Sequence, residues 1–294
     1  MDSTSLWLLL GWSFQEALAV FWRFAYRRNR PTAGVILAAI VAWLHGGALA
    51  GGWRFDDHYQ LIAANSLEFI PSLTDPAAWS GFSPIHYTPG LAWMYRLDSW
   101  AFGLNPAGYY LHLLVSLALI GWLTFYLLSP VAGRYWALLA AVGSVADAPA
   151  LAAAQYLPGR HYVDGLGFVL LALLCQRRWL QNNKPLWLAA SAAAGLLALL
   201  CKEIFLPLCA VLPLLGGMAW RKRLMVAAAH GAVCSAFLYW RAAMLGEFVG
   251  GYDHALTLNS CIIMLPWRFV LAIVGNHGLG LAAAAGYVFL LAVC

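Results

Sequence analysis

Long apolar runs separated by short polar segments dominate the pattern of hydrophobic and polar positions along this chain. Runs close to the roughly 20 residues that a helix needs to cross a bilayer predict membrane spans. We place these spans at residues 34–52, 108–128, 134–154, 162–175, 186–201, 204–220, 224–245 and 278–294. A further apolar segment, 257–275, fits either another span or a helix on the outer surface of the membrane. The sequence therefore predicts an all-α integral membrane protein, a helical bundle of about eight spans, with eight to ten as the range.

The first 33 residues do not fit the pattern of a span. Their apolar part is interrupted by Gln15 and Glu16, no basic residue precedes it, and four arginines follow it. A secretory signal needs a positive start and a small-residue cleavage site, so this pattern argues against one. We interpret residues 1–33 as a cytoplasmic or interfacial segment and residues 34–294 as one transmembrane domain.

The longest polar segment runs from about residue 53 to 107 and is rich in proline and tryptophan. Such a composition is typical of a structured loop at a membrane surface. We expect a large first outer loop that carries short amphipathic helices, one of them over about residues 91–102. The dipeptide Asn105-Pro106 marks its end, because the residue before proline is disfavoured in helical geometry.

Composition and charge placement agree with a membrane protein. The chain is 63% hydrophobic and only 10% charged, too apolar for an ordinary soluble surface. If the acidic loop is outside, eleven of the 17 basic residues fall inside: Arg23, Arg27, Arg28, Arg30, Arg134, Arg177, Arg178, Lys184, Arg221, Lys222 and Arg223. Positive residues favour the cytoplasmic side, which predicts a multi-pass membrane protein with its loop on the non-cytoplasmic side. The formal charge of +5 comes from these short groups, and no basic stripe indicates nucleic-acid binding.

Charged residues at the outer ends of the predicted spans suggest chemistry. Asp56 and Asp57 form an acid pair after the first span, and paired acids are costly beside a bilayer. Three cations, Arg160, Lys202 and Arg241, fall at the same face. This combination suits a donor with an anionic phosphate, held by the cations while a carboxylate handles a hydroxyl group.

Several motifs resemble the protein mannosyltransferase-related glycosyltransferases of the GT-C fold, in their bacterial and TMTC-like branch. The resemblance covers about residues 34–253 and is carried by Phe55-Asp56-Asp57 with Ile62 and Asn65, Tyr87-Thr88-Pro89, the segment 96–111, Gly159-Arg160, Lys202-Glu203, and the segment from Arg241 to Tyr252. It implies an enzyme of the bacterial inner membrane that moves a sugar from a polyprenyl-phosphate donor to a protein, lipid or glycan acceptor on the periplasmic side.

The resemblance also implies roles for individual residues. In the family the first acid of the loop motif is the catalytic base, which by position is Asp56 here. Asp57 would position the acceptor or the base, and Arg160, Lys202 or Arg241 would balance charge on the departing phosphate. The residues expected in support are Glu203 and His86, with Tyr87 beside it, and Trp53 and Tyr59, which have rings suited to stacking on a sugar.

No cofactor is predicted, and a divalent metal is only a weak alternative. Four histidines expected outside, His58, His86, His161 and His254, could join the acids as ligands, but their spacing fits no closed metal motif. Histidines within spans, such as His112, are expected to be packing residues. Asp147, near a span end, fits a hydrogen-bonded buried group or a cavity residue equally well.

A second class of function stays open. A non-catalytic membrane protein, either a lipid-carrier transporter or a degenerate scaffold, is favoured by His86, because the related branch leads us to expect an Arg-like residue there. Transport would also favour charged residues at span centres, and apart from Asp147 these are nearly absent.

Overall fold

The computed structural model describes residues 30–214 and 218–246, and all regular secondary structure in these ranges is helical. The prediction of an all-α protein is confirmed for this part of the chain. The N-terminal segment up to residue 29 and the segments predicted at 257–275 and 278–294 lie outside the described residues.

Two stretches are long and apolar enough to cross a membrane, judged by length and composition. The first, Pro31–Ala50, combines α2 (Arg30–His45) with the short helix η1 (Gly46–Ala50), and the second is α7 (Pro106–Ala146). Three further helices complete the bundle: α9 (Arg160–Asn182), α10 (Pro185–Cys201) and α12 (Trp220–Leu245). In the described part of the chain, the number of helices that pass this test is therefore smaller than the eight predicted spans.

The predicted span over 204–220 does not form one continuous helix. It is broken into η3 (Glu203–Phe205), α11 (Leu206–Val211) and η4 (Leu212–Leu214). Pro207 and Pro213 explain the breaks, because proline lacks the amide hydrogen that a continuing helix needs. The hydrophobicity of residues 204–220 alone predicts one continuous helix.

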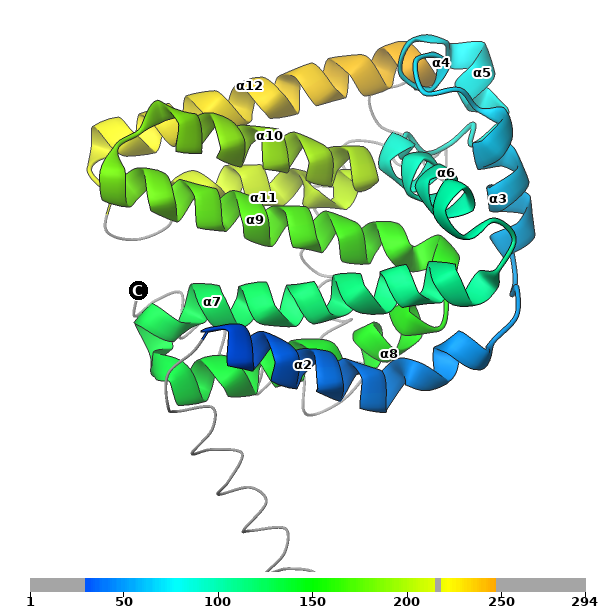
Figure 1. Cartoon of the computed structure of the whole chain (residues 1–294). Coiled ribbons are helices and arrows are strands. Elements are labelled where there is room, and N and C mark those ends of the chain that lie inside the picture. The colour runs from blue at the N-terminus through cyan, green and yellow to red at the C-terminus, as the bar shows by residue number, and fades with distance from the viewer. Residues whose placement is uncertain (1–29, 215–217, 247–294) are drawn as a thin grey trace, which may run out of the picture.

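The helix α7 is a hairpin of two antiparallel arms. Its backbone leaves helical geometry at Gly133, which has a φ of 75° that glycine adopts at little cost. A Cβ atom placed on Gly121 would lie 3.0 Å from Cγ1 of Val145, so residues 24 positions apart are in contact. The arms correspond to the predicted spans at 108–128 and 134–154, and Figure 1 shows the chain turning back between them.

The second arm ends before α8 (Ala148–Ala154) at Asp147, which caps that helix. The carboxylate of Asp147 accepts a hydrogen bond of 2.8 Å from the amide of Ala150, and the residue is exposed. Neither of the two roles expected for Asp147 is therefore seen; it supplies the acceptor that the first turn of a helix requires.

A cap of short helices covers one end of the bundle, as the predicted outer loop required. It contains α3 (Asp57–Ser66), α4 (Pro71–Thr74), α5 (Pro76–Ser80) and α6 (Pro89–Phe102). Prolines open three of these helices, because their fixed φ suits the first helical position. Trp240 of α12 donates a hydrogen bond of 2.6 Å to the carbonyl of Leu73, which ties the bundle to the cap.

The long helices lie side by side, and their charges separate along the bundle (Figure 1). The ends of α2, α10 and α12 and the starts of α7 and α9 lie beside the cap. The opposite end is formed by the turn of α7 at Gly133, the end of α9 and the starts of α10 and α12 (Figure 1). These segments carry the basic residues Arg134, Arg177, Arg178, Lys184, Arg221, Lys222 and Arg223. This is the segregation that the sequence predicted for the two faces of a membrane protein.

We expect Gly121→Leu to destabilise the hairpin by about 1–3 kcal/mol, because the larger side chain meets Val145 across the two arms. The free energy of unfolding in detergent micelles measures this effect. Gly143→Leu is the matched control, since a side chain there meets nothing within 4 Å. Equal stabilities for the two variants would contradict the close packing of the arms.

Candidate functional site at the capped end of the bundle

The turn from Arg54 to Asp57 places two acids in different environments. Phe55 has a φ of 48°, a left-handed conformation that is costly for a residue with a side chain. Asp57 is fully buried, and its Oδ2 accepts a hydrogen bond of 2.8 Å from the amide of Arg54, which closes the turn. Asp56 is exposed and makes no capping hydrogen bond to α3. Asp57 therefore holds the turn, while Asp56 faces outward.

Two tyrosines surround the buried acid. The Oδ1 atom of Asp57 and the hydroxyls of Tyr95 and Tyr110 are inaccessible, and none meets the geometry of a hydrogen bond among the described residues. Burial raises the pKa of Asp57, and the amide of Arg54, the nearby Tyr110 hydroxyl and the charge of Arg54 offset only part of that effect. Burial also raises the pKa of Tyr95, so its hydroxyl stays protonated at neutral pH.

Arg160, which the sequence proposed as a phosphate ligand, is completely buried in an ion cluster. Its guanidinium donates to Asp98 of the cap and, at 3.2 Å, to Asp164 of its own helix. His112 of α7 approaches the other oxygen of Asp98 at 2.5 Å, and Ser116 donates to Asp164 at 2.9 Å. The cluster joins the cap to α7 and α9.

The other two predicted cations, Lys202 and Arg241, lie where α10 and α12 end. Gly90 of α6 packs so closely on α10 that a Cβ there would lie 3.1 Å from the carbonyl of Leu200, which brings Lys202 under the cap. Lys202 and Arg241 are both buried. Burial lowers the pKa of Lys202, the charge of Glu203 opposes that shift, and the charge of Arg241 adds to it. The two cations are thus close enough to repel each other.

Glu203 is the carboxylate of this second cluster. It lies 3.8 Å from Nζ of Lys202 and 3.5 Å from Nδ1 of His86. Burial would raise the pKa of Glu203, but the nearby imidazole of His86 and the charge of Lys202 outweigh it and lower the pKa to about 2. His161 lies close enough to Lys202 and Glu203 to interact electrostatically with both, and neither of its ring nitrogens meets hydrogen-bond geometry.

The predicted aromatic residues are divided between the cap core and the surface. Tyr87 is fully buried against Trp79, with ring centroids 5.1 Å apart, and its hydroxyl approaches the carbonyl of Ser72. Trp53 packs edge-on against Tyr109, while Tyr59 is exposed on α3. The sugar-stacking role of Trp53 and Tyr59 stays a prediction.

The structure links the two clusters through the cap. Tyr95 of α6 lies within electrostatic reach of both Asp57 and Arg160, and its ring centroid is 5.9 Å from Cζ of Arg160. The next residue along α9, His161, reaches Lys202. The turn that carries the acids and the helix ends that carry the cations therefore all lie at the capped end of the bundle.

Within residues 30–214 and 218–246, no group of three or more His, Cys, Asp or Glu side chains is arranged to hold a metal ion. His58 is exposed on α3, His86 and His161 lie in the Glu203 cluster, and His254 lies outside the described residues.

Sequence reasoning missed the partners of Arg160. Its spacing from Arg160 could have identified Asp164 as a partner, because residues four apart on a helix are neighbours. Asp98 and His112 carried no such signal, since their contacts with Arg160 span 62 and 48 residues. His112, expected to be a packing residue, is part of the ion cluster.

Comparisons with models of known protein families, with curated proteins and with solved structures found no match for this chain.

We expect Arg160→Met to lower the free energy of unfolding by about 3–5 kcal/mol, because it leaves Asp98 and Asp164 buried without a counter-charge. Unfolding in detergent micelles, followed by tryptophan fluorescence, measures the loss. Arg178→Met, on the exposed part of the same helix, should change stability by no more than about 0.5 kcal/mol. A loss below about 1 kcal/mol for Arg160→Met would refute the structural role given to the cluster.

The pKa of Glu203 gives a dependence of stability on pH. Because its folded pKa of about 2 lies below the ordinary value of 4.5, ionised Glu203 stabilises the fold above pH 4.5. That stabilisation is lost as the pH falls through 2. We expect Glu203→Gln to be less stable than the wild type at pH 6, with a difference that shrinks between pH 4.5 and pH 2. A difference that is the same at both ends of this range would contradict the assignment; Glu68→Gln, on an exposed carboxylate, serves as control.

Proposed function

We propose that the protein is a glycosyltransferase of the bacterial inner membrane. It transfers a sugar from a polyprenyl-phosphate donor to an acceptor hydroxyl on the periplasmic side. The observation that carries the proposal is the turn at the capped end, where Asp56 is exposed next to buried Asp57. Buried Lys202 and Arg241 belong to the ends of α10 and α12, which lie at the same end of the bundle (Figure 1). An accessible carboxylate and buried cations at one end of the bundle match the needs of hydroxyl attack on a phosphate-linked sugar.

The membrane setting is supported by two features of the bundle. Two helical stretches are long and apolar enough to cross a bilayer, and the basic residues gather at the end opposite the cap. Under the positive-inside rule this end lies in the cytoplasm, which orients the cap to the periplasm. We propose about eight spans, with the hairpin arms of α7 counted as two.

Asp56 acts as the general base in this proposal. Its side chain is exposed, so an acceptor can reach it, and the strained residue before it fixes the direction of the turn. The carboxylate takes the proton of the acceptor hydroxyl as the acceptor oxygen bonds to the anomeric carbon. Asp57, anchored inside by the amide of Arg54, positions Asp56 and does not itself meet the acceptor.

Lys202 and Arg241 receive the leaving group. As the bond from the anomeric carbon to the phosphate oxygen breaks, its electron pair stays on the phosphate, and the configuration at the carbon inverts. Lys202 has Glu203 at 3.8 Å, and the negative charge of the departing phosphate adds to the stabilisation of the two buried cations. Arg160 already has two carboxylate partners, so we assign it to holding the cap instead of the phosphate.

The test is Asp56→Asn, measured as transfer of mannose from a polyprenyl-phosphate mannose donor by the purified protein. Loss of a general base costs roughly 10²–10⁴-fold in rate, and we expect a loss in that range without a loss of folded protein. Glu68→Gln, which removes another exposed carboxylate of the cap, should keep wild-type activity.

A wild-type protein that transfers no sugar would favour the alternative: binding of the donor without transfer would indicate a lipid-carrier transporter, and absence of binding a scaffold. An Asp56→Asn variant with more than a tenth of wild-type activity would show that another group acts as base.

A further inference from the structure

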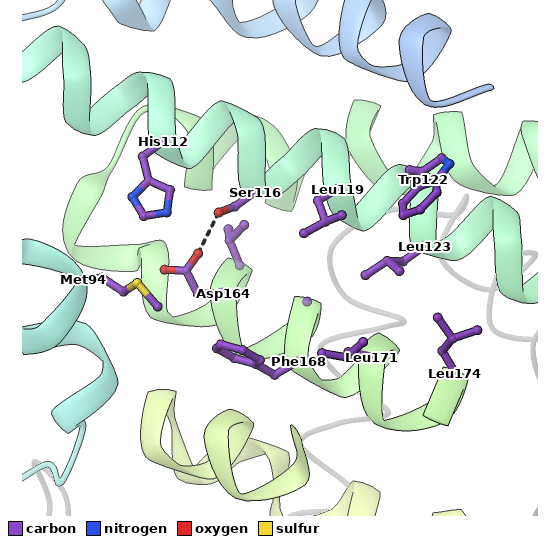
Figure 2. A pocket seen from close by; sticks show the side chains of 12 residues that line it. Met94, His112, Ser116, Leu119, Trp122, Leu123, Asp164, Phe168, Leu171 and Leu174 are labelled. Atoms are coloured by element: carbon purple, nitrogen blue, oxygen red, sulfur yellow. Dashed lines mark hydrogen bonds between the residues drawn. The ribbon is translucent and has the colours of Figure 1, made fainter. Parts of the chain in front are cut away.

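A groove of about 360 Å³ runs between the first arm of α7 and α9, away from the acids and cations of the proposed transferase site. Figure 2 shows its apolar side chains from both helices, among them Leu119, Leu123, Phe168 and Leu171. Its volume is in the range of small-ligand pockets.

The groove is long and narrow. On α7 its lining extends from His112 to Leu123, and on α9 from Val163 to Leu174. Each stretch covers eleven helical steps, or roughly 16 Å along the axis. A trough of this length with apolar walls fits a single extended hydrocarbon chain.

Two arginines, Arg177 and Arg178, lie at one end of the groove. Leu174 lines both the groove and a smaller pocket of about 80 Å³ formed with Tyr126, Arg177 and Arg178. Arg178 donates to the hydroxyl of Tyr126 at 2.8 Å, and Arg177 approaches the carbonyl of Leu127 at 3.4 Å. A guanidinium has five N–H donors, so both arginines keep donors for an anionic group.

The other end of the groove does not suit an anion. Asp164 lies there, its oxygens occupied by Ser116 and by Arg160, as the dashed line in Figure 2 shows for Ser116. Arg160 is completely buried and engaged with two carboxylates. A bound amphiphile would therefore have its negative head at the arginine end and its chain directed toward Asp164.

We propose that this groove binds an anionic phospholipid, with its phosphate at Arg177 and Arg178 and one acyl chain along α7 and α9. Basic pockets between membrane helices recognise lipid head groups through the same chemistry. The arginine end of the site lies at the basic end of the bundle, and the groove runs from there to Met94 and Asp164 beside the cap. Lipid binding in this groove does not depend on sugar transfer.

Lipid retention by the purified full chain in neutral detergent tests the proposal, with native mass spectrometry as the readout. The probes are phosphatidylglycerol and phosphatidylcholine with identical acyl chains, added separately at matched concentrations. We expect tighter binding of phosphatidylglycerol, and a loss of about tenfold or more when Arg177→Gln and Arg178→Gln are combined. Arg221→Gln with Lys222→Gln, which removes the same charge from α12 at the same end, should leave binding unchanged.

The groove itself is tested by Gly167→Leu. Gly167 lines the groove, and a Cβ atom there would meet nothing within 4 Å, so the backbone of α9 has room for a side chain that extends into the groove. We expect the variant to lose phosphatidylglycerol, whereas Gly231→Leu, at an open position on α12, should retain it.

Three results would overturn the proposal. Equal binding of the two lipids would point to unspecific lipid around the protein. Undiminished binding by Gly167→Leu would place the lipid outside the groove. Displacement by inorganic phosphate at the concentration of the lipid would indicate a site for free phosphate.

Discussion

The buried contact of Arg160 with Asp98 and Asp164 is the interaction on which the arrangement of the capped end depends. Asp98 belongs to the cap, while Arg160 and Asp164 begin α9, so the ion cluster fixes the cap on the bundle. A buried charge without its partner costs several kcal/mol, which strongly disfavours any position of α6 that separates the two. His112 extends the same constraint to α7.

This constraint divides the cations of the capped end into two kinds. Arg160 is neutralised by two carboxylates and holds the cap, whereas Lys202 has the one carboxylate of Glu203 at 3.8 Å, and burial together with the charge of Arg241 lowers its pKa. The acids divide in the same way, since Asp57 is buried and Asp56 is exposed. In the proposed transferase Asp57 and Arg160 hold the structure of the capped end, while Asp56 and Lys202 take part in the reaction.

The sequence was sufficient for features that depend on local pattern. Apolar runs located the helices and the division of α7 near Gly133, Asn105-Pro106 located the end of the cap, and the basic groups marked one end of the bundle. It failed at Pro207 and Pro213, where apolar composition concealed a broken helix. It could not find Asp98 and His112, because long-range side-chain contacts leave no trace in spacing. The adjacency of Asp56 and Asp57 suggested a pair, but neighbouring residues at a helix start point in different directions.

The most direct test is an experimental structure of the protein with a non-hydrolysable polyprenyl-phosphonate sugar analogue. The account predicts that the phosphonate oxygens lie within hydrogen-bond distance of Lys202 and Arg241, with the anomeric carbon facing Asp56. Asp57 and Arg160 should keep their contacts with the Arg54 amide and with Asp98. An analogue bound elsewhere, or one whose phosphonate replaces Asp98 at Arg160, would contradict it.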